Sequence, residues 1–510
     1  MERNSPTYRT LWNAIYGFIG YAWPIALALF VTPIIVLNLG IKNYGLYIFI
    51  NTISGLVGLL DLGVAASFIK YTAEYSSARE NNKLQHHVTG ANLIFLLVAL
   101  IGFLVIIAAS LVSHDRVGGN VTKSIYYACF FLAAGIFFVN TGASSFYSIP
   151  TALQRLDLGK KIGLTRVTLT SLTIVGFLLA GYGLVAVFAI TLFYDLIFAV
   201  VFWFAARRML PGISFWPGWQ PAEMRRCYQF GLVYFVSNWA NQLLYQLDKL
   251  LIPYVFGPTQ LAYYSLPGTV TTKIQGLTGG LAAVMMPLSS QLQGQGDRER
   301  LRRVYARGFR LLFTAAFGLT AAVVIYAHDI LFYWLSADVA DNSSQVLVIL
   351  AITYLILALF VPLNNFLLGL GKTKELAYFS LLMLVLNVMF LVILLPIYGI
   401  VGAAWAFLLS VLPVLGLFRY TETRILNLTG QMVTNLKLLI KNLTCAALLY
   451  MLVVFFLRGL ISSLFSRVAV FGVSLAFYYS AFVLLRFLDS EDSRMARDFM
   501  VAVFRPAKRL

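Results

Sequence analysis

The stretch VTGANLIFLLVALIGFLVIIAASLV, residues 88–112, carries no charged side chain. Folded as an α-helix, it is long enough to cross the roughly 30 Å of hydrocarbon in a lipid bilayer. Apolar runs of similar length recur along the chain, which predicts an all-α, polytopic membrane protein with fourteen transmembrane helices. We place these helices at 11–39, 44–69, 88–112, 124–148, 162–180, 183–205, 228–256, 261–290, 309–327, 345–369, 375–395, 399–418, 438–457 and 464–487.

The composition of the chain agrees with this class. Hydrophobic residues make up 60% of the 510 residues and charged residues only 11%, whereas an ordinary soluble domain has about 25% charged residues. A soluble protein could not cover so much apolar surface, and a disordered chain would not carry it. The sequence contains no CxxC motif among its three cysteines, Cys129, Cys227 and Cys445, and its four histidines have no metal-ligand spacing. We therefore expect no metal and no cofactor.

The excess of basic residues predicts the topology. The chain has 38 Lys+Arg and 20 Asp+Glu, a formal net charge of +18, which is typical either of nucleic-acid binding or of membrane insertion. If the N-terminus is cytoplasmic and the helices alternate, 31 of the 38 basic residues lie in cytoplasmic segments and 5 in outer loops. Because this is the positive-inside distribution, we expect both termini in the cytoplasm and no nucleic-acid partner.

Two halves of the chain resemble each other. The motif YGLV at 182–185 recurs as YGIV at 398–401, an offset of 216 residues, and Gly40 matches Gly257 at an offset of 217. A repeat of six helices would place both copies in the same orientation, with the substrate path between them. We predict an N-lobe at 1–205, an interfacial linker at 206–227, a C-lobe at 228–420, two extra helices within 421–487, and a cytoplasmic tail at 488–510.

Polar side chains recur along the predicted helix 228–256 at spacings of three and four residues, so they share one face. A polar stripe inside a membrane faces water or protein rather than lipid. It either lines a hydrated cavity that binds substrate or forms hydrogen bonds between helices. The stripe consists of Asn238, Asn241, Gln242, Tyr245, Asp248 and Lys249.

Lys273 is a further candidate for substrate binding. It lies near the middle of the predicted helix 261–290, with no acidic residue three or four positions away. An unpaired ammonium at that depth needs an anion, water or a partner from another helix. We expect contact with an anionic substrate; the alternative is a close contact between helices, because Gly276 and Gly280 share the face of Lys273.

Two aspartates inside predicted helices are candidates for coupling or gating. Asp61 in helix 44–69 and Asp195 in helix 183–205 could bind H⁺ or Na⁺ as the coupling ion. The alternative for Asp61 is a structural carboxylate at a helix end. The loops carry no Walker motif, no GxSxG motif and no paired carboxylates beside a histidine, so we expect a transporter rather than an enzyme.

Three stretches resemble the polysaccharide transporter branch of the MOP flippase superfamily, the Wzx-type lipid-linked oligosaccharide flippases. LNLGIKNYGLYIFINTISGLVGLLDLGVAASFIKYTAEY at 37–75 is similar to the signature of the first two helices in this branch, with its Tyr-Gly pair and LLDLG. LYQLDKLLIPYVFGPTQLAYYSLP at 244–267 is similar to the helix 7–8 signature, and LGLGKTKELA at 368–377 to the turn after helix 10. The resemblance covers the first twelve predicted helices.

The resemblance implies a MATE-like, V-shaped transporter of two six-helix lobes, to which helices 13 and 14 are an addition. It implies flipping of undecaprenyl-diphosphate-linked oligosaccharides across the bacterial inner membrane, by alternating access, for O-antigen, exopolysaccharide or capsule synthesis. Lys273 and Lys249 would then meet the diphosphate, and the polar stripe of 228–256 would meet sugar hydroxyls. The implied partners are membrane lipids, the lipid-linked oligosaccharide, and a polymerase and chain-length regulator of the same pathway.

Three alternatives stay open. A MATE-type cation or drug exporter would have an acidic cavity. The five charges that we place at membrane depth are three acids and two bases: Asp61, Asp195, Asp248, Lys249 and Lys273. A membrane-embedded transferase of surface polysaccharide would carry acidic or histidine-bearing loops at one membrane face. A scaffold without transport activity would need neither the repeat nor the polar stripe.

Overall fold

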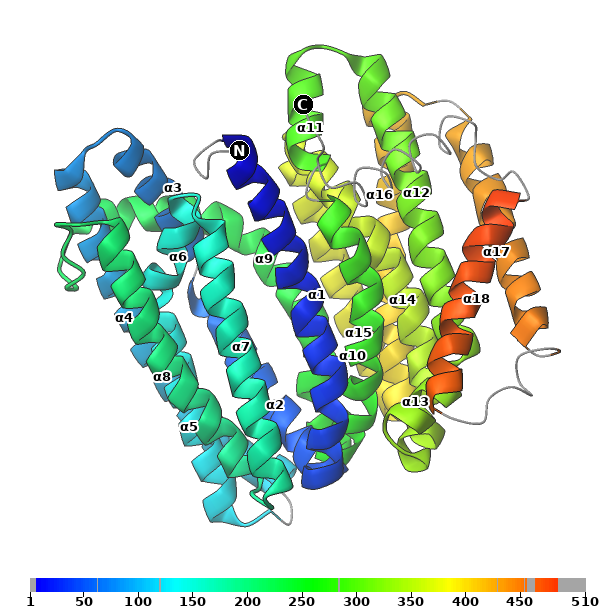
Figure 1. The fold of residues 1–510 in the computed structure, drawn as a ribbon, viewed down its shortest axis with the longest axis horizontal. Helices are drawn as coiled ribbons and strands as arrows, with labels where there is room; N and C mark the ends of the chain where they lie inside the picture. Colours follow the sequence, from blue (N-terminus) through cyan, green and yellow to red (C-terminus); the bar gives the residue numbers. More distant parts are fainter. Residues whose placement is uncertain are drawn as a thin grey trace. The chain divides into compact units, whose positions relative to one another are not determined.

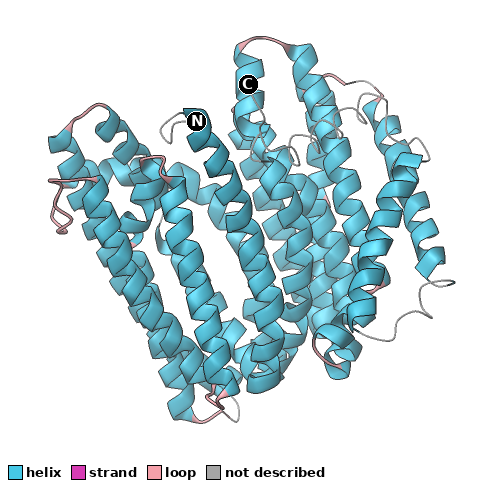
Figure 2. Cartoon of the chain, in the orientation of Figure 1, coloured by secondary structure: helices cyan, strands magenta, loops and turns pink. Residues whose placement is uncertain are grey.

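The computed structural model describes residues 6–61, 63–118, 121–282, 285–428, 430–453, 455 and 464–484. Within these ranges the chain is almost entirely helical and contains no strand (Figure 2). The chain divides into two compact units, which we describe separately. Unit 1 comprises Met1–Val270 and Ser380–Ser410, and unit 2 comprises Thr271–Phe379 and Val411–Leu510.

Unit 1 is a bundle of long helices in which α4 packs on α5, α5 on α8, and α1 on α7 (Figure 1). The large aromatic side chains of Phe68 and Phe95 are completely buried where α3 meets α4. The helices are α1 (Pro6–Leu39), α2 (Ile41–Val57), α3 (Val64–Ser77), α4 (Asn81–Ser113), α5 (Lys123–Gly142), α6 (Ser144–Ala152), α7 (Leu156–Leu179), α8 (Leu184–Met209) and α9 (Pro221–Phe256).

Unit 2 is built around α12 and α14, with α17 and α18 packed on α12 (Figure 1). Cys445, Tyr478 and Phe482 form the buried core between the last two helices. Two helices, α10 (Pro258–Ala282) and α15 (Thr373–Val411), contribute residues to both units. The others are α11 (Met285–Gly294), α12 (Arg298–Ile325), α13 (Ala327–Trp334), α14 (Ala337–Gly369), α16 (Pro413–Tyr420), α17 (Gln431–Leu452) and α18 (Leu464–Leu484).

Many of these helices are long and apolar enough to cross a membrane. Within the described ranges, nine segments meet this condition by length and composition, and two shorter apolar helices lie at Trp23–Leu39 and Val470–Val483. One of the nine, Thr373–Ile425, spans two of the predicted helices, because α15 bends at Gly399, where φ is +60°. The all-α, multi-pass class is confirmed, whereas the number fourteen stays a prediction.

The predicted helix 44–69 is interrupted in its second half. α2 ends at Val57, a single 3₁₀ turn covers Gly58–Asp61, and α3 begins at Val64. Gly63 has φ +78°, a conformation that glycine adopts without strain. The Asp61 carboxylate accepts a hydrogen bond of 3.2 Å from the Ala65 backbone N–H at the start of α3. Hydrophobicity alone does not reveal this break, because apolar residues lie on both sides of it.

Glycines account for two features of the sequence. Gly40 and Gly257, paired by the offset of 217 residues, have φ values of +77° and +83° and extended ψ values. They adopt the same backbone conformation, while the repeat itself stays a prediction. Gly45 lies where α2 meets the start of α10, and a Cβ atom there would come within 1.8 Å of the Pro258 carbonyl oxygen. The glycine of the Tyr-Gly pair in the 37–75 stretch is therefore needed for close packing.

The connection between α8 and α9 is shorter than the predicted linker 206–227, because α8 ends at Met209 and α9 begins at Pro221. It is held against α4 by hydrogen bonds. Gln85 donates to the Ser214 carbonyl at 2.9 Å and accepts from its N–H at 2.7 Å, and Asn92 donates to the Phe215 carbonyl at 2.7 Å. The side chains of Trp216 and Trp219 remain 82% and 72% exposed.

The first turn of α9 is anchored on the α3–α4 hairpin by charged and aromatic groups. Arg226 donates a hydrogen bond to the Tyr75 hydroxyl and lies 3.5 Å from the Glu223 carboxylate. Glu223 also lies 3.5 Å from Nδ1 of the buried His87. Burial and the Glu223 carboxylate raise the pKa of the Tyr75 hydroxyl, so Tyr75 is a neutral donor and acceptor here.

Candidate functional site

Asp248 is the most buried charged member of the predicted α9 stripe, at 3% exposure. One carboxylate oxygen accepts a hydrogen bond from the Tyr264 hydroxyl of α10. The other accepts from the backbone N–H of Lys249 at 2.8 Å. A buried carboxylate must be hydrogen-bonded to be tolerated, and these two donors meet that need. Asp248 thus links α9 to the first half of α10.

The other members of the stripe whose side chains the structure describes are more accessible than Asp248. Asn241, Tyr245 and Lys249 are half-buried, and Gln242 is exposed. The Tyr245 ring packs edge-on against Phe407 of α15, with ring centroids 5.9 Å apart. The backbone of Asn238 lies in α9, but its side chain lies outside the described part of the structure. Exposure of these polar groups at spacings of three and four residues is compatible with contact to a polar ligand.

Lys273 lies in α10, in the part of that helix that belongs to unit 2, and is half-buried. Within the described ranges, no acidic side chain lies at ion-pair distance from its ammonium. The stripe on the opposite face of α10 is buried: the Thr278 hydroxyl donates to the Ala358 carbonyl of α14 at 2.6 Å. The opposite stripe therefore packs against α14, which leaves the Lys273 face of α10 for another contact.

Asp195 acquires partners that are distant in the sequence. Its carboxylate, 5% exposed, lies 3.3 Å from Nη1 of Arg166 in α7 and accepts a 2.7 Å hydrogen bond from the Asn140 amide of α5. The same Nη1 donates to Oδ1 of Asn140 at 3.1 Å, and the guanidinium lies over the Tyr147 ring. The Asp195, Arg166 and Asn140 side chains form a charged cluster that joins α5, α7 and α8. Asn140 and Arg166 also line a cavity of about 360 Å³.

The Asp195 carboxylate has both a charged and a neutral partner in this structure. Arg166 balances its charge, and Asn140 donates a hydrogen bond to it. Arg166 lies within the predicted helix 162–180 and within α7, which begins at Leu156. The Asp61 carboxylate is similarly engaged, because it accepts from the Ala65 N–H. The geometry of Asp61 matches its structural alternative, and coupling or gating by either aspartate stays a prediction.

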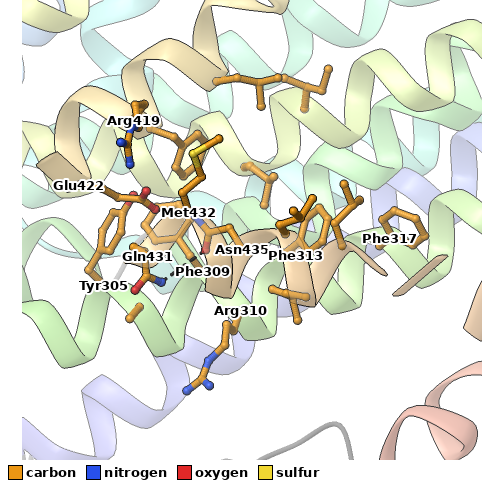
Figure 3. A pocket seen from close by; sticks show the side chains of 18 of the residues that line it. Tyr305, Phe309, Arg310, Phe313, Phe317, Arg419, Glu422, Gln431, Met432 and Asn435 are labelled. Carbon is orange, nitrogen blue, oxygen red and sulfur yellow. Dashed lines mark hydrogen bonds between the residues drawn. The ribbon is translucent and has the colours of Figure 1, made fainter. Parts of the chain in front are cut away.

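A cavity of about 600 Å³ lies between α12, α14, α16 and α17 in unit 2 (Figure 3). Its wall is mostly apolar and includes Phe309, Phe313 and Phe317 along α12. Figure 3 shows polar groups gathered toward the end of the cavity opposite Phe317. They include Arg419, Glu422, Gln431 and Asn435, and the Asn435 amide donates to Glu422 at 2.8 Å. The cavity is thus amphipathic, and the sequence analysis did not identify it.

Family comparisons define the class of the protein. A bundle of long apolar helices with buried, paired charges is typical of a polytopic transporter. The family model described as "Polysaccharide biosynthesis protein" matches residues 11–293, more than half of the chain, and the MatE model matches residues 234–393. The chain therefore belongs to the polysaccharide biosynthesis protein family, within the MOP flippase superfamily.

Relatives and solved structures agree with this assignment. The "Putative O-antigen transporter" of Shigella flexneri is 23% identical over 425 residues, which cover 81% of this chain and 97% of that protein. The "Probable multidrug resistance protein NorM" of Rhizobium meliloti is 28% identical over 194 residues, 36% of this chain and 41% of that protein. Both matches are to proteins named for transport or drug resistance.

Among solved structures, the lipid II flippase MurJ in an inward closed conformation has a TM-score of 0.70 and 13% identity, over 95% of this chain and 100% of that chain. An outward-facing MATE family multidrug resistance transporter has a TM-score of 0.57 and 14% identity, over 84% and 98%. At these identities the similarity shows the fold alone. The predicted MATE-like architecture is confirmed by both.

Several residues of the polar clusters were not identified from the sequence. Tyr264 was quoted only within the stretch 244–267, yet its hydroxyl donates a hydrogen bond to Asp248. Asn140 and Arg166 were missed as partners of Asp195. The sequence offered one signal for these residues: each is a polar side chain within an apolar run. Which of these side chains meet depends on helix packing, which short-range periodicity does not encode.

Proposed function

We propose that this MOP-superfamily protein flips undecaprenyl-diphosphate-linked oligosaccharides across the bacterial inner membrane for O-antigen, exopolysaccharide or capsule synthesis. The observation that carries the proposal is the family match over residues 11–293, together with similarity to the Shigella flexneri protein along 81% of the chain. Transport proceeds by alternating access, with both termini in the cytoplasm. A polymerase and a chain-length regulator act on the product, and H⁺ or Na⁺ supplies the coupling.

The substrate has three chemical parts, and the chain offers groups suited to each. A diphosphate carries about two negative charges and needs cations to replace its hydration. Lys273, which has no acidic partner among the described residues, is our main candidate, and Lys249 is a second. Sugar hydroxyls suit the amides and hydroxyls of Asn238, Asn241, Gln242 and Tyr245 on α9, beside the buried Asp248.

The third part is the lipid chain. The 600 Å³ cavity along α12 has an apolar wall and a polar end, so its polarity suits a molecule with an apolar chain and a polar head. Burial of apolar chain against Phe313 and Phe317 would gain about 25 cal/mol per Å² of surface removed from water. The polarity of this cavity therefore favours a substrate that has both an apolar chain and a polar head.

The test is export of the surface polysaccharide in a strain whose own copy of the gene is replaced by a variant. We expect Lys273→Ala to lower surface polymer at least tenfold, because the anion loses its counter-charge, while Lys273→Arg keeps most of it. Lys374→Ala, at an exposed position in the first turn of α15, is the matched control and should export normally. Normal polymer in the Lys273→Ala strain, with the variant present in the membrane at the usual amount, would contradict the role of Lys273.

A second candidate is MATE-type export of cations or drugs. The MatE match at residues 234–393 favours it, and the match to NorM covers 41% of that protein. The same strains distinguish the two candidates. Loss of polymer without a change in drug sensitivity supports the flippase, whereas drug sensitivity with normal polymer supports the exporter.

A further inference from the structure

A second cavity of unit 2, about 470 Å³ in volume, has a different chemistry from the apolar one. It lies where the end of α11, the start of α12, the end of α14 and the turn Thr421–Ile425 come together. Four basic side chains line it, and none of the described lining residues is acidic. These four are Arg298, Arg302, Lys372 and Arg424.

The four basic residues come from three separate connections of the chain. Arg298 and Arg302 belong to the first turns of α12, Lys372 precedes α15, and Arg424 follows α16. The positive-inside rule accounts for basic residues in each of these segments. It does not account for their convergence on one hollow. Neighbouring basic residues, such as Arg300 and Lys374, belong to the same segments but do not line the cavity.

The positions of two of these side chains are constrained. Nε of Arg302 donates a 2.5 Å hydrogen bond to the Leu426 carbonyl, which holds the guanidinium at the cavity wall. The Lys372 ammonium lies 3.7 Å from the Glu375 carboxylate, and the two side chains are 44% and 24% exposed, so solvent weakens this pair. Tyr420 and Asn427 add neutral hydrogen-bonding groups to the wall. The cavity is therefore partly preformed and carries a positive potential.

The four positive charges around this cavity repel one another, and a bound anion would offset the repulsion energy. Arginine forms paired N–H···O bonds to phosphate oxygens, and lysine adds a point charge. We propose that this basic cavity binds a phosphate or diphosphate group, carried either by an anionic lipid headgroup or by a free anion. Its volume is in the range of ordinary ligand sites and leaves room for a diphosphate. The proposal does not depend on the transport proposal, because it concerns binding alone.

The test measures binding to the full chain in nanodiscs of phosphatidylcholine, which is neutral overall. Inorganic diphosphate is titrated by calorimetry, and nanodiscs with added phosphatidylglycerol are compared by thermal unfolding. The test variant is Arg298→Gln with Lys372→Gln. The control, Arg300→Gln with Lys374→Gln, has the same net charge and lies in the same segments. We expect the test variant to weaken diphosphate binding, or stabilisation by phosphatidylglycerol, at least tenfold, and the control less than twofold.

Diphosphate binding in phosphatidylcholine nanodiscs would identify a site for a free anion. Stabilisation by phosphatidylglycerol alone, lost in the test variant, would identify a lipid headgroup site. The proposal is overturned if the native chain responds to neither ligand, or if test and control variants lose binding equally. Should the double variant fail to fold, Arg424→Gln compared with Arg303→Gln makes the same distinction, because both are exposed and only Arg424 lines the cavity.

Discussion

Asp195 of unit 1 and Lys273 of unit 2 are both charged residues within membrane helices, but their surroundings differ. The Asp195 carboxylate has a guanidinium at 3.3 Å and an amide at 2.7 Å. Lys273 has no acidic partner among the described residues and is only half-buried. From the sequence, both residues are functional candidates. We therefore expect a charge inside a membrane helix to stabilise the fold where the fold supplies its partner, and to be available for a ligand where it does not.

The largest effect is expected from breaking the satisfied cluster. Arg166→Ala leaves the buried Asp195 with Asn140 as its remaining side-chain donor. Removing one partner of a buried ion pair costs about 3–5 kcal/mol, and the 30% exposure of Arg166 puts this pair at the lower end. Thermal unfolding of the purified protein measures the loss. Adding Asp195→Asn should recover part of it, whereas a native-like Arg166→Ala would mean that the pair is dispensable.

A smaller effect is expected at the other buried carboxylate. Tyr264→Phe removes the hydroxyl that donates to Asp248 and leaves the Lys249 N–H as its donor. Hydrogen bonds to charged groups contribute about 2 kcal/mol, so unfolding should shift by that amount. Tyr254→Phe is the control, because its ring contact with Phe49 is retained. Equal stability of the two variants would show that Asp248 is satisfied without Tyr264.

Thr278 tests whether the face of α10 opposite Lys273 is a packing face. Thr278→Val keeps the shape but removes the 2.6 Å hydrogen bond to the Ala358 carbonyl, which should cost about 1 kcal/mol. Thr278→Ser should keep most of that stability, because it keeps the hydroxyl. Thermal unfolding of the two variants gives the comparison, and no difference between them would argue against a contact with α14.

The smallest effect on stability is expected at Lys273. Lys273→Gln should leave the free energy of unfolding within about 0.5 kcal/mol of the native value, because no described acidic partner is lost. Unfolding of the purified variant, measured beside its polymer export, separates the two roles. A loss as large as that of Arg166→Ala would make Lys273 a structural residue and remove the contrast between the two charges.

Much of the fold was predictable from the sequence. The run 88–112 lies within α4 (Asn81–Ser113), as predicted. Twenty-five residues without a charge are typical of a membrane helix. The break at Gly58–Gly63 was not predictable from hydrophobicity, because a turn inside an apolar run changes hydrogen bonds and leaves composition unchanged. α7 also begins at Leu156, earlier than the predicted start at residue 162.

The candidate site was predictable only in part. The α9 stripe follows from a spacing of three and four residues, which is a property of one helix. The pairing of Asp195 with Arg166 joins residues 29 positions apart on different helices, and its partner Asn140 is 55 positions away. The four basic residues around the 470 Å³ cavity come from three connections. Such sets exist only after the helices have packed.

The sequence alone determined that the chain is a multi-pass helical membrane protein, and its motifs identified the superfamily. Both follow from local properties: the length of apolar runs, the excess of Lys and Arg in the loops, and short spaced signatures. Tertiary structure decided which charges are neutralised. Asp195 and Asp248 gain partners from other helices, whereas Lys273 gains no acidic one among the described residues. The physical reason is that burying a charge is tolerable only with a partner in place, and the packing of distant segments determines which partners are near.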